Sequence, residues 1–71
     1  MSRLLMLRDV ARTLGLSVRK VRMDAAAGRF APALVRFGRA VRVRESELSA
    51  WIDAGCPDRN EWQKRENHHA R

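Results

Sequence analysis

Closely spaced arginines are the residues of this sequence best suited to a specific chemistry. In the stretch VRFGRAVRVRES, residues 35–46, arginine alternates with apolar residues around a glycine, and the run ends at acidic residues. A guanidinium group holds two phosphate oxygens through parallel hydrogen bonds, and each phosphate that is neutralised releases condensed counterion. The pattern therefore indicates a surface that binds a nucleic-acid backbone.

Charge is distributed unevenly along the chain. The 71 residues have a formal net charge of +7, but residues 1–44 contain eleven arginines and lysines against two acids, whereas residues 45–71 contain four against six. A protein that is basic only for solubility does not need one sign of charge concentrated in one part of the chain. We therefore expect the first part to face an anion, with double-stranded DNA as the partner that the helix and hairpin described below favour.

Catalytic, metal and membrane functions are disfavoured by what the sequence lacks. It contains no Ser/His/Asp set, no paired carboxylates and no phosphate-binding glycine loop. Cys56 allows no intramolecular disulfide and is expected to be partly packed, and with the adjacent His68 and His69 it makes a poor metal site. The apolar run at residues 4–7 is too short for a signal peptide or a membrane span. We expect no enzyme, cofactor, metal, small-molecule substrate or membrane partner, and a cytoplasmic, nucleoid-associated protein.

Two short helices joined by a glycine turn are predicted first along the chain. Apolar spacing predicts a helix over residues 7–14 that Gly15 ends. Ser17 can cap a second helix that ends at Gly28. So short a connection makes the two helices cross steeply, as in a helix-turn-helix. The inward residues are expected to be Leu7, Val10, Ala11 and Leu14 in the first helix and Val18, Val21 and Ala25 in the second.

The outward side of the second helix fits the major groove of DNA. Arg19 or Arg22 can bond a guanine edge with two donors, and Lys20 can hold phosphate or guanine. Met23 can contact a thymine methyl group. The residues expected to contact DNA from this helix are Ser17, Arg19, Lys20, Arg22 and Met23.

Residues 35–44 predict a β-hairpin for which two registers compete. A two-residue turn at Gly38-Arg39 suits a type II′ turn, but it sets Arg36 opposite Val41 and mixes the faces. A three-residue loop over 38–40 pairs Arg36 with Arg42 and puts Val35, Phe37, Val41 and Val43 together on one face. We prefer it because one buried face constrains register more strongly than turn preference does, and a β-bulge would reconcile the two registers. Opposed like charges destabilise a sheet unless an anion offsets them. The hairpin residues expected to contact DNA are Arg36, Arg39, Arg42 and Arg44, with Arg39 entering a minor groove.

The rest of the chain predicts two more helices. Apolar residues at helical spacing mark a third helix that begins near residue 45 and that Gly55 ends, with Trp51 in the core. Asp58 and Glu61, three residues apart, form a capping-box variant that begins a short fourth helix. That helix is expected to fold Trp62 back onto the core, and the tail after about residue 65 is expected to fray.

Together these motifs resemble the excisionase and AlpA-type DNA-binding proteins, small relatives of the MerR winged-helix group. The resemblance covers about residues 4–55. It is carried by GLS at 15–17, Gly28, the wing motif VRFGRAVRV at 35–43 and the helix motif SELSAWI at 46–52. Three departures stand out. Met6 occupies a position where the family often has a capping threonine, and Asp24 one that helix-turn-helix patterns usually fill with an apolar residue. The loop from Gly28 to Gly38 is one residue longer than the usual G-x-L-P pattern.

The resemblance implies a fold that is mainly α with a small β-hairpin, a winged helix-turn-helix of order α-α-β-β-α plus a short C-terminal helix. Residues 1–55 would form the DNA-binding domain and residues 56–71 a short C-terminal helix and frayed tail. The helix at 17–27 would enter the major groove, and the hairpin at 35–44 would be a wing on the adjacent minor groove.

The resemblance also implies a function, with two readings. An excisionase, or recombination directionality factor, binds and bends attachment-site DNA and assists a tyrosine integrase in excising a phage or integrative element. An AlpA- or MerR-like transcriptional regulator of an integrase or neighbouring gene needs the same groove contacts and differs only in its partner. We favour the excisionase, with cooperative self-association on repeated sites; a small protein-interaction module is a third, different class.

Overall fold

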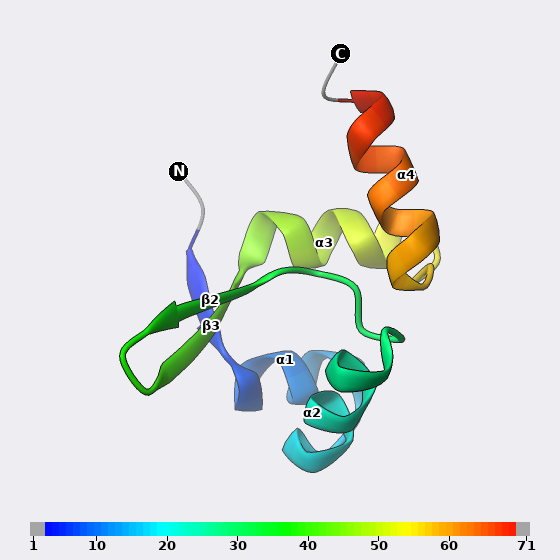
Figure 1. Cartoon of the computed structure of the whole chain (residues 1–71). Coiled ribbons are helices and arrows are strands. Elements are labelled where there is room, and N and C mark those ends of the chain that lie inside the picture. The colour runs from blue at the N-terminus through cyan, green and yellow to red at the C-terminus, as the bar shows by residue number, and fades with distance from the viewer. Residues whose placement is uncertain (1–2, 70–71) are drawn as a thin grey trace.

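The computed structural model describes residues 3–69, with side chains for residues 3–64, as a mixed helical fold with a small antiparallel sheet (Figure 1). In chain order the elements are β1 (Leu4–Met6), α1 (Leu7–Leu14), α2 (Val18–Ala27), β2 (Leu34–Phe37), β3 (Ala40–Arg44), α3 (Glu45–Asp53) and α4 (Arg59–His69). The structure confirms the predicted winged helix-turn-helix and adds the unpredicted strand β1. Helix α4 continues past residue 65, where fraying was expected; residues 70 and 71, and the side chains of His68 and His69, lie outside the described part.

The helix-turn-helix forms where the sequence predicts it. Gly15 adopts a φ of 70°, a left-handed conformation that glycine reaches without a Cβ clash, and the N–H of Leu16 donates to the carbonyl of Ala11 at 2.8 Å. At the start of α2 the Ser17 Oγ accepts a hydrogen bond from the Lys20 backbone N–H at 3.1 Å. This bond satisfies one of the donors that a helix leaves unpaired at its first turn. The two helices are therefore held at a fixed angle by a short connection.

Strand β1 joins the sheet from the N-terminal end of the chain. It pairs antiparallel with β3, with Leu5 opposite Val43 and Met6 opposite Arg42, and the strand order is β1-β3-β2. Leu5 is 9 % exposed and Val43 fully buried. A strand of three residues has too little alternation to be read from sequence, and its stability comes from a partner strand that is distant along the chain.

The hairpin of β2 and β3 has the register of the two-residue turn, which was not the one preferred from the sequence. Arg36 lies opposite Val41, and the turn contains two residues, Gly38-Arg39. Gly38 has a φ of 56° while Arg39 does not have a positive φ, which is the sign pattern of a type II′ turn. The predicted pairing of Arg36 with Arg42 is therefore wrong, and so is the like-charge repulsion inferred from it.

This register is tolerated because the core requires only the start of β2 to be apolar on the inner face. Leu34 lies opposite Val43 and packs against the core. Arg36 shares that face but lies nearer the turn, where an arginine can lay its apolar stem against α2 and keep its charged end exposed. Val35 and Phe37 lie on the opposite face of the sheet. Near the core, burial therefore decides which side chains face inward. At the tip, the geometry of the turn decides how the two strands pair.

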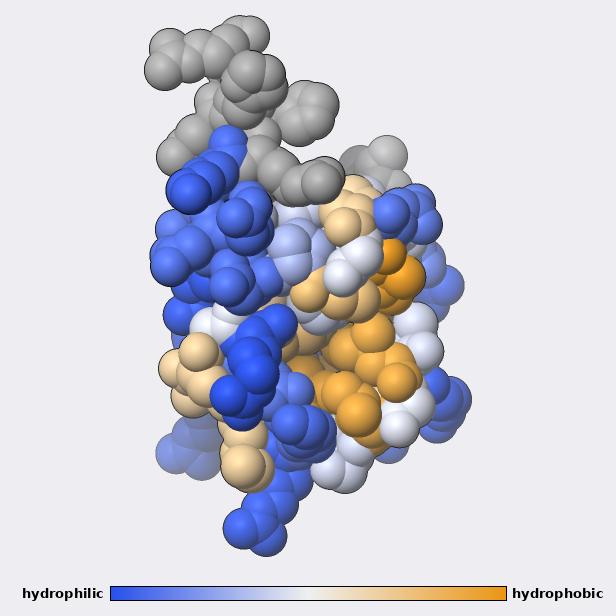
Figure 2. Space-filling view, turned by 90° about the vertical axis from the view of Figure 1, so that its right-hand side faces the viewer, coloured by the Kyte–Doolittle hydropathy of each residue, from blue (hydrophilic) through white to orange (hydrophobic). Residues whose placement is uncertain are grey.

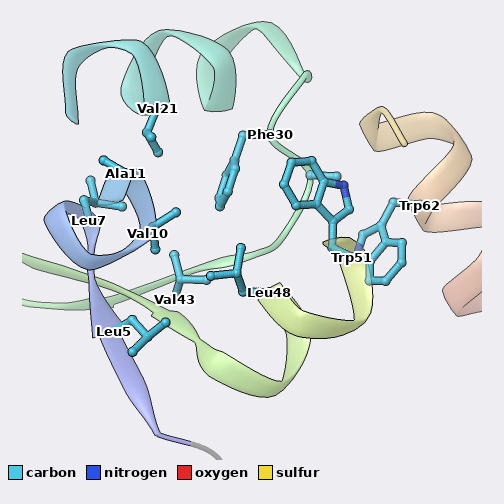
Figure 3. Close-up of a cluster of buried hydrophobic side chains, with 11 residues drawn as sticks. Leu5, Leu7, Val10, Ala11, Val21, Phe30, Val43, Leu48, Trp51 and Trp62 are labelled. Carbon is cyan, nitrogen blue, oxygen red and sulfur yellow. The ribbon is translucent and has the colours of Figure 1, made fainter. Parts of the chain in front are cut away.

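The core lies between the helix-turn-helix and the pair formed by β3 and α3. Figure 3 shows Val21 of α2 and Val10 of α1 on one side and Val43 and Leu48 on the other, with the Phe30 ring beside them. The rings of Phe30 and Trp51 meet edge to face, with centroids 5.1 Å apart. The buried residues are Leu5, Leu7, Val10, Ala11, Val21, Phe30, Ala31, Val43, Leu48, Trp51 and Trp62.

Two tryptophans, Trp51 of α3 and Trp62 of α4, hold the segment after α3 against the core. Trp51 Nε1 donates to the carbonyl of Pro57 at 2.7 Å, and Trp62 Nε1 donates to Glu47 Oε2 at 3.2 Å. Trp51 is 4 % exposed and Trp62 is 7 % exposed, which confirms both as core residues. Cys56, by contrast, is exposed with a φ of 56°, so its predicted partial packing is wrong.

Candidate nucleic-acid interface

The outward side of α2 carries the residues that the sequence predicted for it. Arg19, Lys20, Arg22 and Met23 are all exposed, and Met23 is 54 % exposed. Val21, on the opposite side, is 1 % exposed. Helix α2 therefore presents three cations and one thioether side chain to an approaching partner. Ser17 is exposed as well, although its hydroxyl already accepts the capping bond.

Asp24 neutralises part of this cationic surface. Its Oδ1 accepts hydrogen bonds from Lys20 Nζ at 3.0 Å and from Arg29 Nε at 2.9 Å. The bond from Lys20 is the largest of the influences that hold the pKa of the Asp24 carboxyl below its ordinary value, with Arg29 acting in the same direction against a partial desolvation. The acid at this unusual position thus holds Lys20 against its own helix and ties the end of α2 to the following loop.

Between α2 and the hairpin tip lies a hollow of about 410 Å³ that we call the arginine hollow. Four guanidinium side chains line it, from α1 (Arg8), α2 (Arg22), the turn (Arg39) and β3 (Arg42), and no acid is among its lining residues. The others lining it are Met6, Leu7, Val18, Ala40 and Val41. Four like charges around one concavity attract an anion and raise the local concentration of a polyanion.

A second hollow, of about 330 Å³, lies further along the same groove between α2 and the sheet. It has an apolar floor that includes Leu34 and Val41, and its cations are Arg22, Arg36 and Arg59. Arg22 lines both hollows, so it links them. Arg22 of α2 therefore lies near Arg36, Arg39 and Arg42 of the hairpin, and these four side chains belong to one surface that spans both elements.

Arg44 is the predicted wing residue that the structure separates from the others. It lies opposite Leu4 at the end of β3 and is the N-cap residue of α3, and it lines neither hollow. It stands at the end of the strand away from the turn. Arg19, Lys20 and Met23 also line neither hollow, because they point outward from α2.

Two cations of this surface, Arg8 and Arg59, were missed by sequence reasoning. Arg8 follows the buried Leu7 in the first turn of α1, so its outward position could have been read from the helical period. Arg59 could not, because its place depends on a contact between distant segments. Its backbone N–H donates to the carbonyl of Gly28 at 2.9 Å, and its guanidinium donates to the carbonyl of Ala25.

Polar and apolar side chains are segregated on the side of the molecule that carries α2 and α4. Figure 2 shows a group of apolar residues right of the centre of this view, with hydrophilic residues to the left of it, below it and along the right-hand edge. Within residues 3–64 no group of three or more His, Cys, Asp or Glu side chains could hold a metal ion. None of the helices in the described part of the chain has the length and apolar character needed to cross a bilayer.

Among known proteins, the sequence of this chain matches one family. The sequence model of the helix-turn-helix domain family matches residues 4–56, from the start of β1 to the residue after Gly55. No curated protein and no solved structure matches the chain. The matched range contains α1, α2, the hairpin and α3, and every residue that lines the arginine hollow lies within it.

Proposed function

Because the chain belongs to the helix-turn-helix domain family of AlpA- and excisionase-type DNA-binding proteins, we propose that it is a sequence-specific excisionase. It binds and bends attachment-site DNA and assists a tyrosine integrase in excising a phage or integrative element. Members of this family are typically not enzymes. The observation that carries the proposal is the arginine hollow between α2 and the hairpin tip.

The hollow fits the strand of phosphates that separates a major groove from the next minor groove. With α2 in the major groove and the hairpin tip over the minor groove, the intervening backbone passes between them. Arg8, Arg22, Arg39 and Arg42 then surround its phosphates from separate elements. The cations of the hollow thus lie against the phosphate backbone, where the charge of the duplex is densest. Helix α1 crosses the backbone, as the first helix of a helix-turn-helix does.

Base recognition is assigned to the outward side of α2. Arg19 takes no part in the hydrogen bonds of Asp24 and can bond a guanine edge, and Met23 offers an apolar contact to a thymine methyl group. Lys20 is held by Asp24, which favours a phosphate over a base as its partner. Ser17 serves as the helix cap, so its hydroxyl oxygen already accepts a hydrogen bond within the protein.

The arginine contacts are tested by binding to duplexes at several salt concentrations. Replacing Arg36, Arg39 and Arg42 with alanine should weaken binding to all duplexes and lower the salt slope by about 2 to 3, since each phosphate contact accounts for about 0.9 of the slope. Lys64→Ala removes an exposed charge on α4 and is the matched control. Unchanged binding in the triple variant would remove DNA as the partner of this surface and favour the protein-interaction module.

The integrase contact is assigned to residues 61–66 of α4 together with the exposed flanks of α3, because residues 45–71 contain six acids against four cations, whereas residues 1–44 contain two acids against eleven. Cutting the chain after Gly55 does not isolate this contact, because Trp62 and the carbonyl of Pro57 belong to the folded core. A chain that ends after Lys64 and carries Glu61→Ala keeps those core contacts.

That variant should bind DNA normally and lose excision in a recombination assay with the cognate integrase. Excision equal to wild type would contradict the contact. If the wild-type protein represses a reporter gene but has no effect on excision, it is instead a transcriptional regulator.

A single domain with few base contacts binds one site weakly, so we expect cooperative occupancy of repeated sites. This occupancy should be visible as extended footprints on DNA beside the protein's own gene.

A further inference from the structure

Phe37 is the most exposed large apolar residue in the described part of the chain. It is 57 % exposed, more than Met23, Leu4 or Leu16. It is the last residue of β2, lies opposite Ala40 and directly precedes the turn residues Gly38 and Arg39. An aromatic ring thus stands at the tip of the hairpin.

The core does not account for this ring. The inner face of the sheet is formed by Leu5, Leu34, Val41 and Val43, and Phe37 lies on the opposite face. Among the described residues the ring contact is between Phe30 and Trp51, and Phe37 takes no part in it. A partner outside the core that covers this ring would therefore gain the free energy of removing it from water.

The surroundings of Phe37 indicate which partner covers it. Arg39 lies in the turn two residues after Phe37, and Arg42 lies on the same face of the sheet as Phe37; both line the arginine hollow. No acidic residue occurs between Asp24 and Glu45. An apolar ring set among cations at the end of a narrow ribbon fits a partner that combines phosphates with a stacked apolar interior, which is duplex DNA.

We propose that Phe37 is a wedge that enters duplex DNA from the minor groove and partly unstacks one base step. The proposal rests on the function proposed above and adds the residue that produces the bend. Apolar side chains inserted between base steps kink a duplex towards the major groove, and the unstacking is offset by the additional contacts of the bent DNA. Here those contacts are the arginines of the hollow, which hold the backbone on the side of the tip that faces α2.

The test uses a short duplex from DNA beside the protein's gene that the wild-type protein protects in a footprint. The duplex carries 2-aminopurine at the steps under the wing and a donor and an acceptor dye at its ends. Wild-type protein should raise the 2-aminopurine fluorescence at one step and shorten the distance between the dyes. Phe37→Ala should lose most of both signals while its affinity changes less than about tenfold, because the variant forgoes the ring's stacking but also avoids the cost of unstacking the DNA.

Two variants control for other effects of the substitution. Phe37→Leu keeps an apolar wedge and should retain both signals. Leu4→Ala removes an exposed apolar residue from the same sheet face at the opposite end of the sheet and should behave as wild type. Melting temperatures of all variants report whether each one is folded.

The outcomes separate the wedge from the proposed function. If Phe37→Ala binds the duplex, unstacks it and bends it as the wild type does, the wedge is wrong while DNA binding stands. If Phe37→Ala changes the oligomeric state in the absence of DNA, the ring belongs to a contact between copies and the wedge is again wrong. If wild-type protein protects no duplex, the proposed function itself fails, and the wedge fails with it.

Discussion

Individual arginines are expected to contribute differently to DNA binding because their positions differ. Arg8 lines the arginine hollow, whereas Arg44 lies at the end of β3 away from the turn and lines neither hollow. Both are exposed and carry the same charge. Comparing alanine variants of Arg8 and Arg44 therefore tests the effect of position, because each variant loses the same charge.

Replacing Arg8 with alanine should weaken DNA binding and lower the salt slope by about 1, as expected when a single phosphate loses its cation. Arg44→Ala should change both less, because only the long-range attraction of its charge is removed. Fluorescence anisotropy of a labelled duplex over a range of salt concentrations measures both. Equal effects of the two substitutions would show that the hollow has no special role.

Asp24 gives the stability of the protein a dependence on acid. Its folded-state pKa is lowered, first by the hydrogen bond from Lys20, below the ordinary aspartate pKa of 3.8. A lowered pKa means that the ionised carboxylate contributes stability above pH 3.8, and that this contribution is lost as the pH falls through the lowered value. We therefore expect Asp24→Asn to melt at a lower temperature than wild type at pH 7, and the difference to shrink below about pH 4.

Thermal melts at about pH 7 and about pH 3, on either side of the ordinary aspartate pKa, measure this difference. Asp53→Asn removes an exposed carboxylate from α3 and is the control for the general loss of negative charge. A gap between wild type and Asp24→Asn that is the same at both pH values would contradict the stabilising role of the ionised carboxylate.

At the scale of elements, the two helices of the helix-turn-helix begin in different ways. Ser17 caps α2 with its hydroxyl, whereas Met6 precedes α1 and its side chain makes no capping bond. Asp9 compensates in part, since its Oδ2 accepts a hydrogen bond from the Met6 backbone N–H at 3.2 Å. The start of α1 thus has one half of a capping box.

Met6→Thr should stabilise the protein by about 0.5–1 kcal/mol, because a hydroxyl at this position completes the capping box with Asp9. Ser17→Ala should destabilise it by about 1 kcal/mol, because the Lys20 N–H is then left without its capping oxygen. Chemical denaturation measures both. Met6→Thr without a gain in stability would mean that the packing of the Met6 side chain outweighs the cap.

The largest departure of the elements from expectation concerns the hairpin. Its strands lie where the arginine pattern predicts them, but their register follows the turn at Gly38-Arg39. The alternation of Val35 and Phe37 was taken to define a buried face, yet the inner face uses Leu34 instead. Pattern alone cannot distinguish a buried face from a face reserved for a partner, because both are apolar.

At the scale of the whole molecule, stability depends on contacts between the C-terminal segment and the rest. Glu47 Oε2 accepts hydrogen bonds from Trp62 Nε1 and from the Ala33 backbone N–H, both at 3.2 Å. One carboxylate oxygen therefore joins α3, α4 and the loop before β2. Arg59 joins α4 to the end of α2 in the same way.

Trp62→Ala should destabilise the protein by about 3–5 kcal/mol, the usual cost of removing a large buried aromatic side chain. For a domain of this size that loss is close to the whole stability. A chain ending after Gly55 should therefore be largely unfolded, and one ending after Lys64 should melt near the wild-type temperature. Circular dichroism during heating measures this, and a well-folded chain ending at Gly55 would contradict the role given to Trp62.

The helices, their glycine ends, the hairpin and the cationic character of the surface could be predicted from local sequence, because helical periodicity, capping residues and local charge act over a few neighbouring residues. The third strand, the register, the burial of Phe30 and the place of Arg59 beside α2 became visible only in the folded chain. Each of these depends on residues far apart in the chain meeting around one small core, and the free energy of such a meeting is not encoded in any local stretch.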